Sequence, residues 1–164
     1  MTAPSADRIR PARPDDAPAM ARVFAAAIEA KAGRSYGPRE RAAWIARGSA
    51  ERLAAMAGDP ENRLLVVEAA TETPGLTGLA GLRGCEVSLL YTAPTAAPGT
   101  GVRLLRTVEA LARESGLKGL TLNASRNALA FYLSQGYAVL RLASRPLPGG
   151  VSLPVCLMAK TLVP

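Results

Sequence analysis

The sequence predicts a single mixed α/β (α+β) domain of about seven strands and about four helices, spanning residues 1–164. Three observations predict it. The chain has 164 residues, 49% of them hydrophobic and 20% charged, which suits one domain with one substantial core. Up to Met56 the apolar residues follow a helical period, whereas after Gly58 they form short strand-like runs. The second half then alternates such runs with amphipathic stretches that end at glycine.

The first elements are a short strand and helices. Residues 1–7 are expected to be disordered, and residues 9–12 to form the first strand. A helix follows from a cap near Asp15 to Gly33, because apolar residues recur on one face, at Met20, Val23, Phe24, Ala27 and Ile28. Pro38 suits the start of the next helix, which carries Trp44 and closes at Gly48. Ser49 can cap another helical stretch to Met56.

The remaining elements are mostly strands. The sequence predicts three strands, at residues 64–67, 76–82 and 86–92, which are separated by turn signals at 71–75 and Gly84. A helix follows the loop 94–101 and ends at Gly116, and 120–122 forms a short buried strand. A helix over 127–135 precedes two last strands, 137–142 and 151–161. The order is thus strand, two helices, three strands, helix, strand, helix, two strands.

The composition excludes several kinds of site. Cys85 and Cys156 lack metal-ligand spacing, and the chain contains no histidine to complete a zinc site or a Ser-His or Cys-His pair. We therefore expect no metal, and any general base must be a carboxylate or water. No signal peptide or membrane span is visible, so we expect a cytoplasmic protein without a membrane partner.

The net charge is +7, which favours a polyanionic partner such as nucleic acid or a phosphorylated cofactor. The same charge is also consistent with a merely solvated surface, since no contiguous basic block occurs. Two Phe and one Trp, without an interleaved aromatic-basic stretch, argue against stacking on single strands, so we expect no nucleic acid partner.

Residues 93–105 (APTAAPGTGVRLL) lead from a strand through Gly99-Thr100-Gly101 into a helix. A helix N-terminus presents unpaired N–H groups and partial positive charge, which suits phosphate. These glycines are equally consistent with a simple strand-to-helix turn. The GxxxxGK and GxGxxG patterns are absent, which argues against nucleoside triphosphate and dinucleotide loops.

A second segment, residues 122–137 (LNASRNALAFYLSQGY), leads from a strand into a helix. Together the two segments resemble the GCN5-related N-acetyltransferase (GNAT) superfamily. Its Gln/Arg-x-x-Gly-x-Gly/Ala loop is matched by Gly99, Gly101, Leu104 and Leu105. Its Asn/Ser-x-x-Ala-x-x-Phe-Tyr-x-x-x-Gly-Phe/Tyr helix is matched by Ser125, Ala128, Phe131, Tyr132, Gly136 and Tyr137. The resemblance extends over essentially the whole domain.

The resemblance implies an acyl-CoA N-acyltransferase fold with a mixed, mostly antiparallel central sheet. It also implies transfer of acetyl from acetyl-CoA, as co-substrate, to a primary amine by direct attack in a ternary complex. The CoA pyrophosphate would lie on the loop, at Ala97, Gly99, Thr100, Gly101, Val102 and Arg103. Two departures from the family pattern are Ala96, where Gln or Arg is usual, and Pro98, which lacks an N–H.

The resemblance also implies roles near the acetyl group. Tyr132 stands at the position of the general acid, and Glu86 is the candidate base, acting through water, or else a solvent-facing strand residue. The third strand of the meander would border the acetyl group at Leu90 and would stabilise the oxyanion near Tyr91 or Thr92. Ser125 and Asn127 would bind the pantetheine arm, although Asn127 can instead cap its helix. Tyr36 and Trp44 would either shape the amine pocket or only pack.

Several alternatives stay open at the level of sequence. A non-catalytic module that binds acyl-CoA keeps the fold without the chemistry. The acceptor can be a peptide or small-molecule amine, the donor can be a larger acyl-CoA, and the chain can be a monomer or a homodimer.

Overall fold

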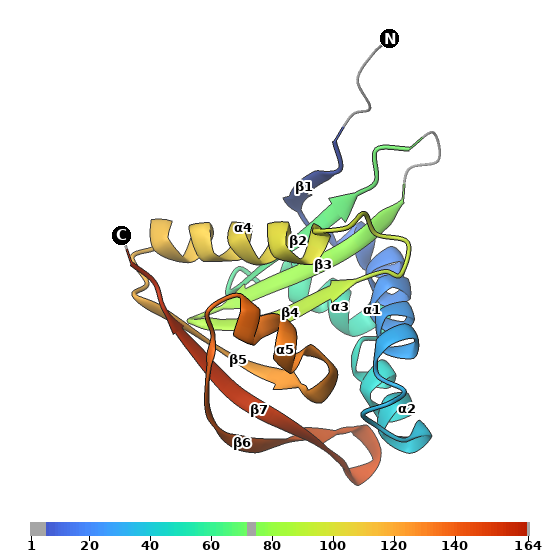
Figure 1. Cartoon of the computed structure of the whole chain (residues 1–164). Helices are drawn as coiled ribbons and strands as arrows, with labels where there is room; N and C mark the ends of the chain where they lie inside the picture. Colours follow the sequence, from blue (N-terminus) through green and yellow to red (C-terminus); the bar gives the residue numbers. More distant parts are fainter. Residues whose placement is uncertain (1–5, 72–74, 164) are drawn as a thin grey trace.

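One sheet organises the chain. In residues 6–71 and 75–163, which the computed structural model describes, seven strands pair in the order β1-β2-β3-β4-β5-β7-β6 (Figure 1). They are β1 (Arg8–Pro11), β2 (Asn62–Glu68), β3 (Leu76–Arg83), β4 (Glu86–Thr92), β5 (Gly119–Ser125), β6 (Ala138–Leu147) and β7 (Val151–Thr161). Neighbours are antiparallel except β4 and β5, which are parallel. The predicted mixed, mostly antiparallel sheet is confirmed.

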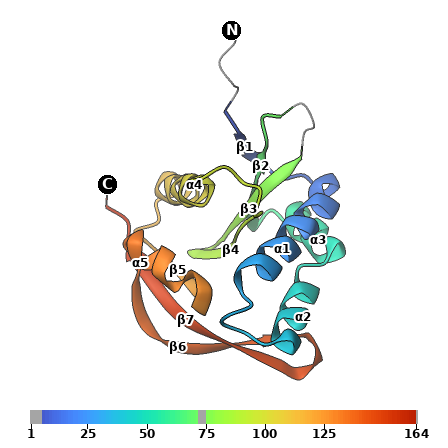
Figure 2. The same cartoon turned by 45° about the vertical axis from the view of Figure 1, so that its right-hand side comes forward.

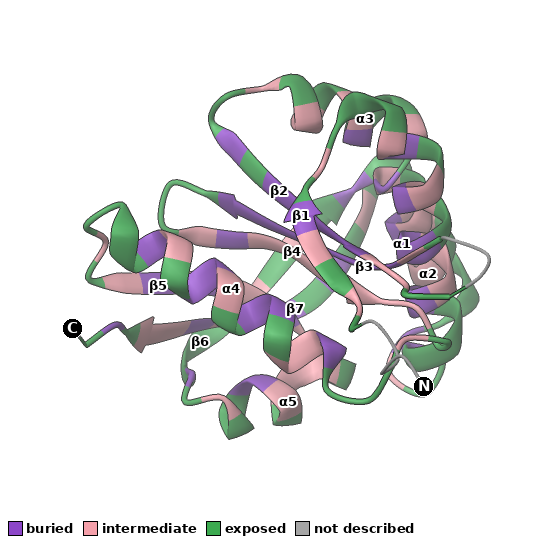
Figure 3. Cartoon of the chain, turned by 90° about the horizontal axis from the view of Figure 1, so that it is seen from above, coloured by how far each residue is buried: buried purple, intermediate pink, exposed green. Residues whose placement is uncertain are grey.

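Helices cover both faces of this sheet. Within the described residues the α-helices are α1 (Ala17–Lys31), α2 (Pro38–Arg47), α3 (Ala50–Gly58), α4 (Thr100–Glu114) and α5 (Leu129–Ser134). Figure 3 shows α4 and α5 on one face and α1, α2 and α3 on the other. The count of about four was one too low because the stretch after Ser49 is a separate helix, whose cap Oγ accepts the Arg52 N–H at 3.2 Å.

The predicted core faces are buried. All five apolar residues predicted for the first helix lie on α1 with at most 5% of their surface exposed. On α4, Leu104, Leu105 and Val108 are fully buried against the sheet. The hydrophobic period of each helix therefore identified the face that meets the strands.

Some boundaries differ from the prediction. β6 continues to Leu147, five residues beyond the predicted end, and the predicted helix 127–135 begins as a 3-10 turn (Arg126–Ala128) before the short α5. Asp7, the last residue of the predicted disordered start, lies within the described residues, and its carboxylate accepts the Ala70 N–H at 3.0 Å. Residues 1–5 of the predicted disordered start, and 72–74 of the predicted hairpin loop, lie outside the described residues.

The parallel strands β4 and β5 separate almost at once. Their only registered pair is Glu86 with Thr121, at the start of both strands, and Figure 1 shows them diverging toward their C-terminal ends. From the angle of Figure 2, α5 and α1 lie on opposite sides of this opening. The sheet therefore contains one gap, between β4 and β5, and its strands are paired on either side of that gap.

Candidate active site

A cavity of about 340 Å³ lies where β4 and β5 diverge. Its walls come from α1, α2, β4, the start of α4, β5, α5 and the β6–β7 hairpin. It brings together eight of the residues predicted from the sequence: Trp44, Leu90, Tyr91, Thr92, Gly101, Ser125, Asn127 and Tyr132.

Backbone groups line both edges of this opening. The Ala93 N–H donates to the Thr77 carbonyl of β3, at 2.8 Å. Because successive residues of a strand direct their N–H groups to opposite neighbours, the N–H groups of Leu90 and Thr92 face β5 instead. Across the gap, the Thr121 N–H donates to the Cys85 carbonyl, so Asn123 and Ser125 direct theirs toward β4. Of the amides at the end of β4, those of Leu90 and Thr92 therefore face the gap, whereas that of Tyr91 faces β3.

Tyr132 closes one side of the cavity. Its ring packs edge-on against Phe131 and Tyr137, at centroid distances of 5.2 and 5.7 Å, and only 7% of the residue is exposed. Its hydroxyl has no hydrogen-bond partner in the described part of the chain. Burial raises the pKa of Tyr132, so the phenol keeps its proton at neutral pH.

The glycine loop enters α4 in the conformation that only glycine adopts readily. Gly99 has a φ of 84° at the N-cap. The Thr100 N–H donates to the Ala97 carbonyl and the Arg103 N–H to the Gly99 carbonyl, which leaves the amides of Ala97, Gly99, Gly101 and Val102 without an acceptor among the described residues. Four N–H groups at one helix terminus suit an anion.

Arg103 adds less to this loop than predicted. Its guanidinium donates to the Asp7 carbonyl at 2.9 Å, which ties the start of the described chain to α4. Both its backbone and its side chain are therefore already engaged.

Glu86 lies apart from the other catalytic candidate. It is the first residue of β4, and it lines a second cavity of about 200 Å³ instead of the first. The two cavities adjoin, since both are lined by Trp44, Ser88, Leu89, Tyr91 and Arg145. The structure therefore places Glu86 and Tyr132 in neighbouring cavities.

Of the two aromatic residues predicted for the amine pocket, only Trp44 lines a cavity, and it lines both. Its Nε1–H donates to the Tyr91 hydroxyl at 3.1 Å. The Tyr36 hydroxyl donates to the Pro154 carbonyl at 2.5 Å and accepts the Arg126 N–H at 2.9 Å. These bonds favour the packing interpretation for Tyr36.

The cavity also contains residues that sequence reasoning missed. Lys31, at the end of α1, donates from Nζ to the Thr92 carbonyl at 2.8 Å and to its hydroxyl at 2.6 Å, and burial lowers the pKa of Lys31. Asn123 lies two residues before Ser125, so the period of a strand could have identified it. No local signal could have identified Lys31, since its contact spans 61 residues.

Other kinds of site find no support in the described ranges. Nowhere in 6–71 and 75–163 do three His, Cys, Asp or Glu side chains gather as metal ligands would. The helices of the same residues are too short or too polar to cross a membrane.

The fold matches known acetyltransferase structures. A GCN5-related N-acetyltransferase from Rhodopseudomonas palustris is 28% identical, with 99% of each chain covered and a TM-score of 0.86. The PaiA N-acetyltransferase of Thermoplasma acidophilum, solved with coenzyme A, is 20% identical, with 96% of this chain and 99% of that one covered and a TM-score of 0.77.

A third structure, the putative acetyltransferase YncA of Salmonella typhimurium with its cofactor acetyl-CoA, is 23% identical over 98% of this chain and 96% of that one, with a TM-score of 0.61. A comparison with curated protein sequences finds no match. The model of the acetyltransferase (GNAT) domain family matches residues 32–145, which is more than half of the sequence. The chain therefore belongs to the GNAT family of acetyltransferases.

Proposed function

We propose that this protein is an N-acetyltransferase that transfers the acetyl group of acetyl-CoA to a primary amine within a ternary complex. The observation that carries the proposal is the opening between β4 and β5, where unpaired backbone groups line both edges and a buried phenol lies alongside. Family membership and the structures solved with coenzyme A or acetyl-CoA support it.

The residues present fit this co-substrate. The four free amides at Ala97, Gly99, Gly101 and Val102 would hold the pyrophosphate through the backbone, so Ala96 and Pro98 remove little that the site needs. The N–H groups of Leu90 and Thr92 would bind the amide groups of the pantetheine arm or the acetyl oxygen. Ser125 and Asn127, at the end of β5, would bind the arm from the other side. When bound, acetyl-CoA would supply the thioester carbonyl that an amine attacks and the thiol that leaves.

This chain's own residues would manage the protons. An amine such as lysine, with a pKa of about 10.4, must lose a proton before it attacks, and Glu86 would accept that proton through water in the adjoining cavity. The Thr92 or Leu90 amide would stabilise negative charge on the carbonyl oxygen. Tyr132, kept neutral by burial, would donate its proton to the departing sulfur.

Acetyl-CoA titration by calorimetry, followed by a thiol-release assay over a panel of amines, tests the proposal. We expect saturable binding and release of CoA that depends on one class of amine. Binding without release from any amine would support the non-catalytic alternative, which the substitutions at Ala96 and Pro98 motivate. Absence of binding at millimolar acetyl-CoA would refute both.

Three related expectations stay predictions. Acetyl is the expected acyl group, and turnover of longer acyl-CoA thioesters in the same assay would correct it. A homodimer would be recognised by sedimentation analysis, and a cytoplasmic location by fractionation of the producing cells.

A further inference from the structure

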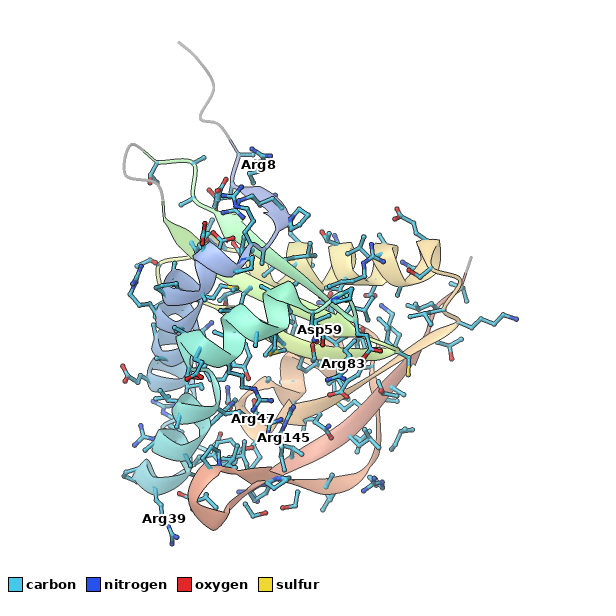
Figure 4. The ribbon with its side chains drawn as sticks, turned by 180° about the vertical axis from the view of Figure 1, so that it is seen from behind. Arg8, Arg39, Arg47, Asp59, Arg83 and Arg145 are labelled. Atoms are coloured by element: carbon cyan, nitrogen blue, oxygen red, sulfur yellow. The ribbon has the colours of Figure 1, made fainter. Side chains whose placement is uncertain are left out.

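The second cavity is lined mainly by cations among its charged residues. Four arginines, Arg47, Arg52, Arg83 and Arg145, contribute to its wall, against the single carboxylate of Glu86. They come from four elements, α2, α3, β3 and β6, so the fold gathers them at one place. Figure 4 shows Arg47 beside Arg145, with Arg83 at the end of β3.

Three of these cations have no acidic partner. Of these four arginines, only Arg83 forms a salt bridge with a described residue, the exposed Glu61, at 3.4 Å. Arg47 donates to the Pro146 carbonyl at 3.0 Å, and the guanidinium groups of Arg52 and Arg145 make no hydrogen bond there. Burial, and then the charges of Arg145 and Arg52, lower the pKa of Arg47, which indicates that these cations oppose one another. A bound anion would relieve this repulsion.

Two buried polar atoms in the same wall also lack partners. The Asn62 Nδ2 donates to Asp59 Oδ2 at 3.1 Å, which fixes the amide and leaves Oδ1 unbonded. The Ser88 Oγ is unbonded as well. Ser88 is the extra residue of a bulge in β4, because Gly81 pairs with Leu89 and Leu82 with Val87. Bulges often redirect side chains beside active sites, and an unpaired buried polar atom indicates a missing polar partner.

The cations are separate from the glycine loop. No residue of 93–101 lines the second cavity, whereas Gly101 lines the first. Trp44 and Tyr91, joined by their hydrogen bond, and Arg145 line both cavities. A ligand on the arginines would therefore adjoin the acetyl-transfer site without occupying the expected phosphate site.

We propose that the second cavity binds the acceptor and that the acceptor is a small amine bearing a carboxylate, of the size of an amino acid. This rests on the acetyltransferase function proposed above. Arg145 and Arg47 bind the carboxylate, because guanidinium groups pair with it through two parallel hydrogen bonds. Glu86, the only carboxylate in this wall, takes a proton from the ammonium group before the amine meets the thioester in the adjoining cavity. A cavity of about 200 Å³ suits a ligand of the size of an amino acid.

The single tryptophan of the chain makes the test direct. Because Trp44 lines both cavities, its fluorescence should respond to a ligand in either. The protein is titrated with the common L-amino acids, with their α-amides, and with O-phosphoethanolamine beside ethanolamine. We expect at least one amino acid to change the Trp44 fluorescence in a saturable way, at a concentration about 10-fold or more below that needed of its amide. The amide lacks the charged carboxylate that would accept hydrogen bonds from the arginines.

Arg145→Gln is the decisive variant, since its guanidinium makes no hydrogen bond within the described protein. It should weaken amino-acid binding about 10- to 100-fold, while Arg145→Lys retains part of it. Arg39→Gln is the matched control, because Arg39 lies on α2 but lines neither cavity. Figure 4 shows Arg39 at the other end of α2 from Arg47. Arg47→Gln is informative only where circular dichroism shows a native fold, since Arg47 also joins α2 to β6.

Three results would overturn the proposal. They are no saturable fluorescence response to any amino acid at low salt, equal amino-acid binding by wild type and Arg145→Gln, or tighter binding of O-phosphoethanolamine than of any amino acid. Calorimetry with acetyl-CoA separates this proposal from the proposed function. Acetyl-CoA binding without an amino-acid response refutes only the carboxylate site. An amino-acid response without acetyl-CoA binding refutes the acetyltransferase, and with it the acceptor role, and leaves only a carboxylate-binding cavity.

Discussion

The start of α4 allows the co-substrate site to be tested without disturbing the fold. A Cβ added to Gly101 would lie 3.6 Å from Phe131 Cζ and 3.9 Å from Thr92 Cγ2, which are ordinary van der Waals distances. Gly101 also has no positive φ, unlike Gly99. Gly101→Ala should therefore fold, and it should gain up to about 1 kcal/mol of helix stability.

Gly101→Glu adds a negative charge where we expect pyrophosphate. At about 5 Å and an effective dielectric constant of about 20, one pair of like charges costs roughly 3 kcal/mol, which corresponds to a loss of about 100-fold or more in affinity. The same charge stabilises the free protein by about 0.3–1 kcal/mol, because it lies at a helix N-terminus. The variant should thus bind acetyl-CoA far more weakly while melting no lower than wild type.

Calorimetric titration of wild type, Gly101→Ala and Gly101→Glu, with a thermal melt of each, separates these effects. Gly101→Ala should bind within severalfold of wild type. The reasoning fails if Gly101→Glu binds acetyl-CoA like wild type. It also fails if Gly101→Ala loses binding to the same degree, since bulk and not charge would then be responsible.

Three further predictions concern single side chains. Tyr132→Phe should lower kcat by about 100-fold and leave the affinity for acetyl-CoA within severalfold of wild type. Because burial raises the pKa of Tyr132, the kcat of the wild type should not fall below pH 10 through loss of this proton. Steady-state kinetics at several pH values checks both predictions. A hydrogen bond from Arg10, with an N–O distance of 2.8 Å, lowers the pKa of Asp16 from 3.8 to about 2. Asp16→Asn should therefore lower the free energy of unfolding by about 2 kcal/mol at pH 7. That difference should disappear in urea unfolding as the pH falls from 3.8 toward 2. Lys160→Met should lower the free energy of unfolding by about 3–5 kcal/mol, because it leaves the carboxylate of Glu109 buried without a partner. Glu109 is 4% exposed and lies 2.9 Å from the Lys160 ammonium group. A decrease of less than about 1 kcal/mol in urea unfolding would contradict this.

The parts of the fold that follow local patterns were predictable from the sequence. The core faces of α1 and α4 follow from a repeat within each helix. Pro38 at the first position of α2 and the Ser49 cap of α3 act over a few residues. The extension of β6 to Leu147 was not predictable in this way, because residues 143–147 contain Ser, Arg and Pro and pair only with β7 across the hairpin. Pairing in three dimensions decided that boundary.

The same distinction between local patterns and long-range contacts applies to the candidate site. The glycine loop and the Tyr132 helix are contiguous motifs, and the structure brings Gly101 and Tyr132 to one cavity. The position of Glu86 beside four arginines depends on contacts among distant elements, which no spacing in the sequence encodes. The two bonds of the Tyr36 hydroxyl likewise span 118 and 90 residues.

The single registered pair between β4 and β5 has a consequence for how the protein responds to its co-substrate. The sheet consists of a four-stranded part, β1 to β4, and a three-stranded part, β5 to β7, that meet at one seam. A ligand that hydrogen-bonds to both edges would act as an added strand and make the two parts mechanically continuous. Its binding energy would add to global stability, by about 2.7 kcal/mol at a concentration 100 times its Kd. The amide hydrogens of Leu90 and Thr92 would then exchange with solvent rapidly in the free protein and slowly in the complex, so that exchange rates at this seam report occupancy.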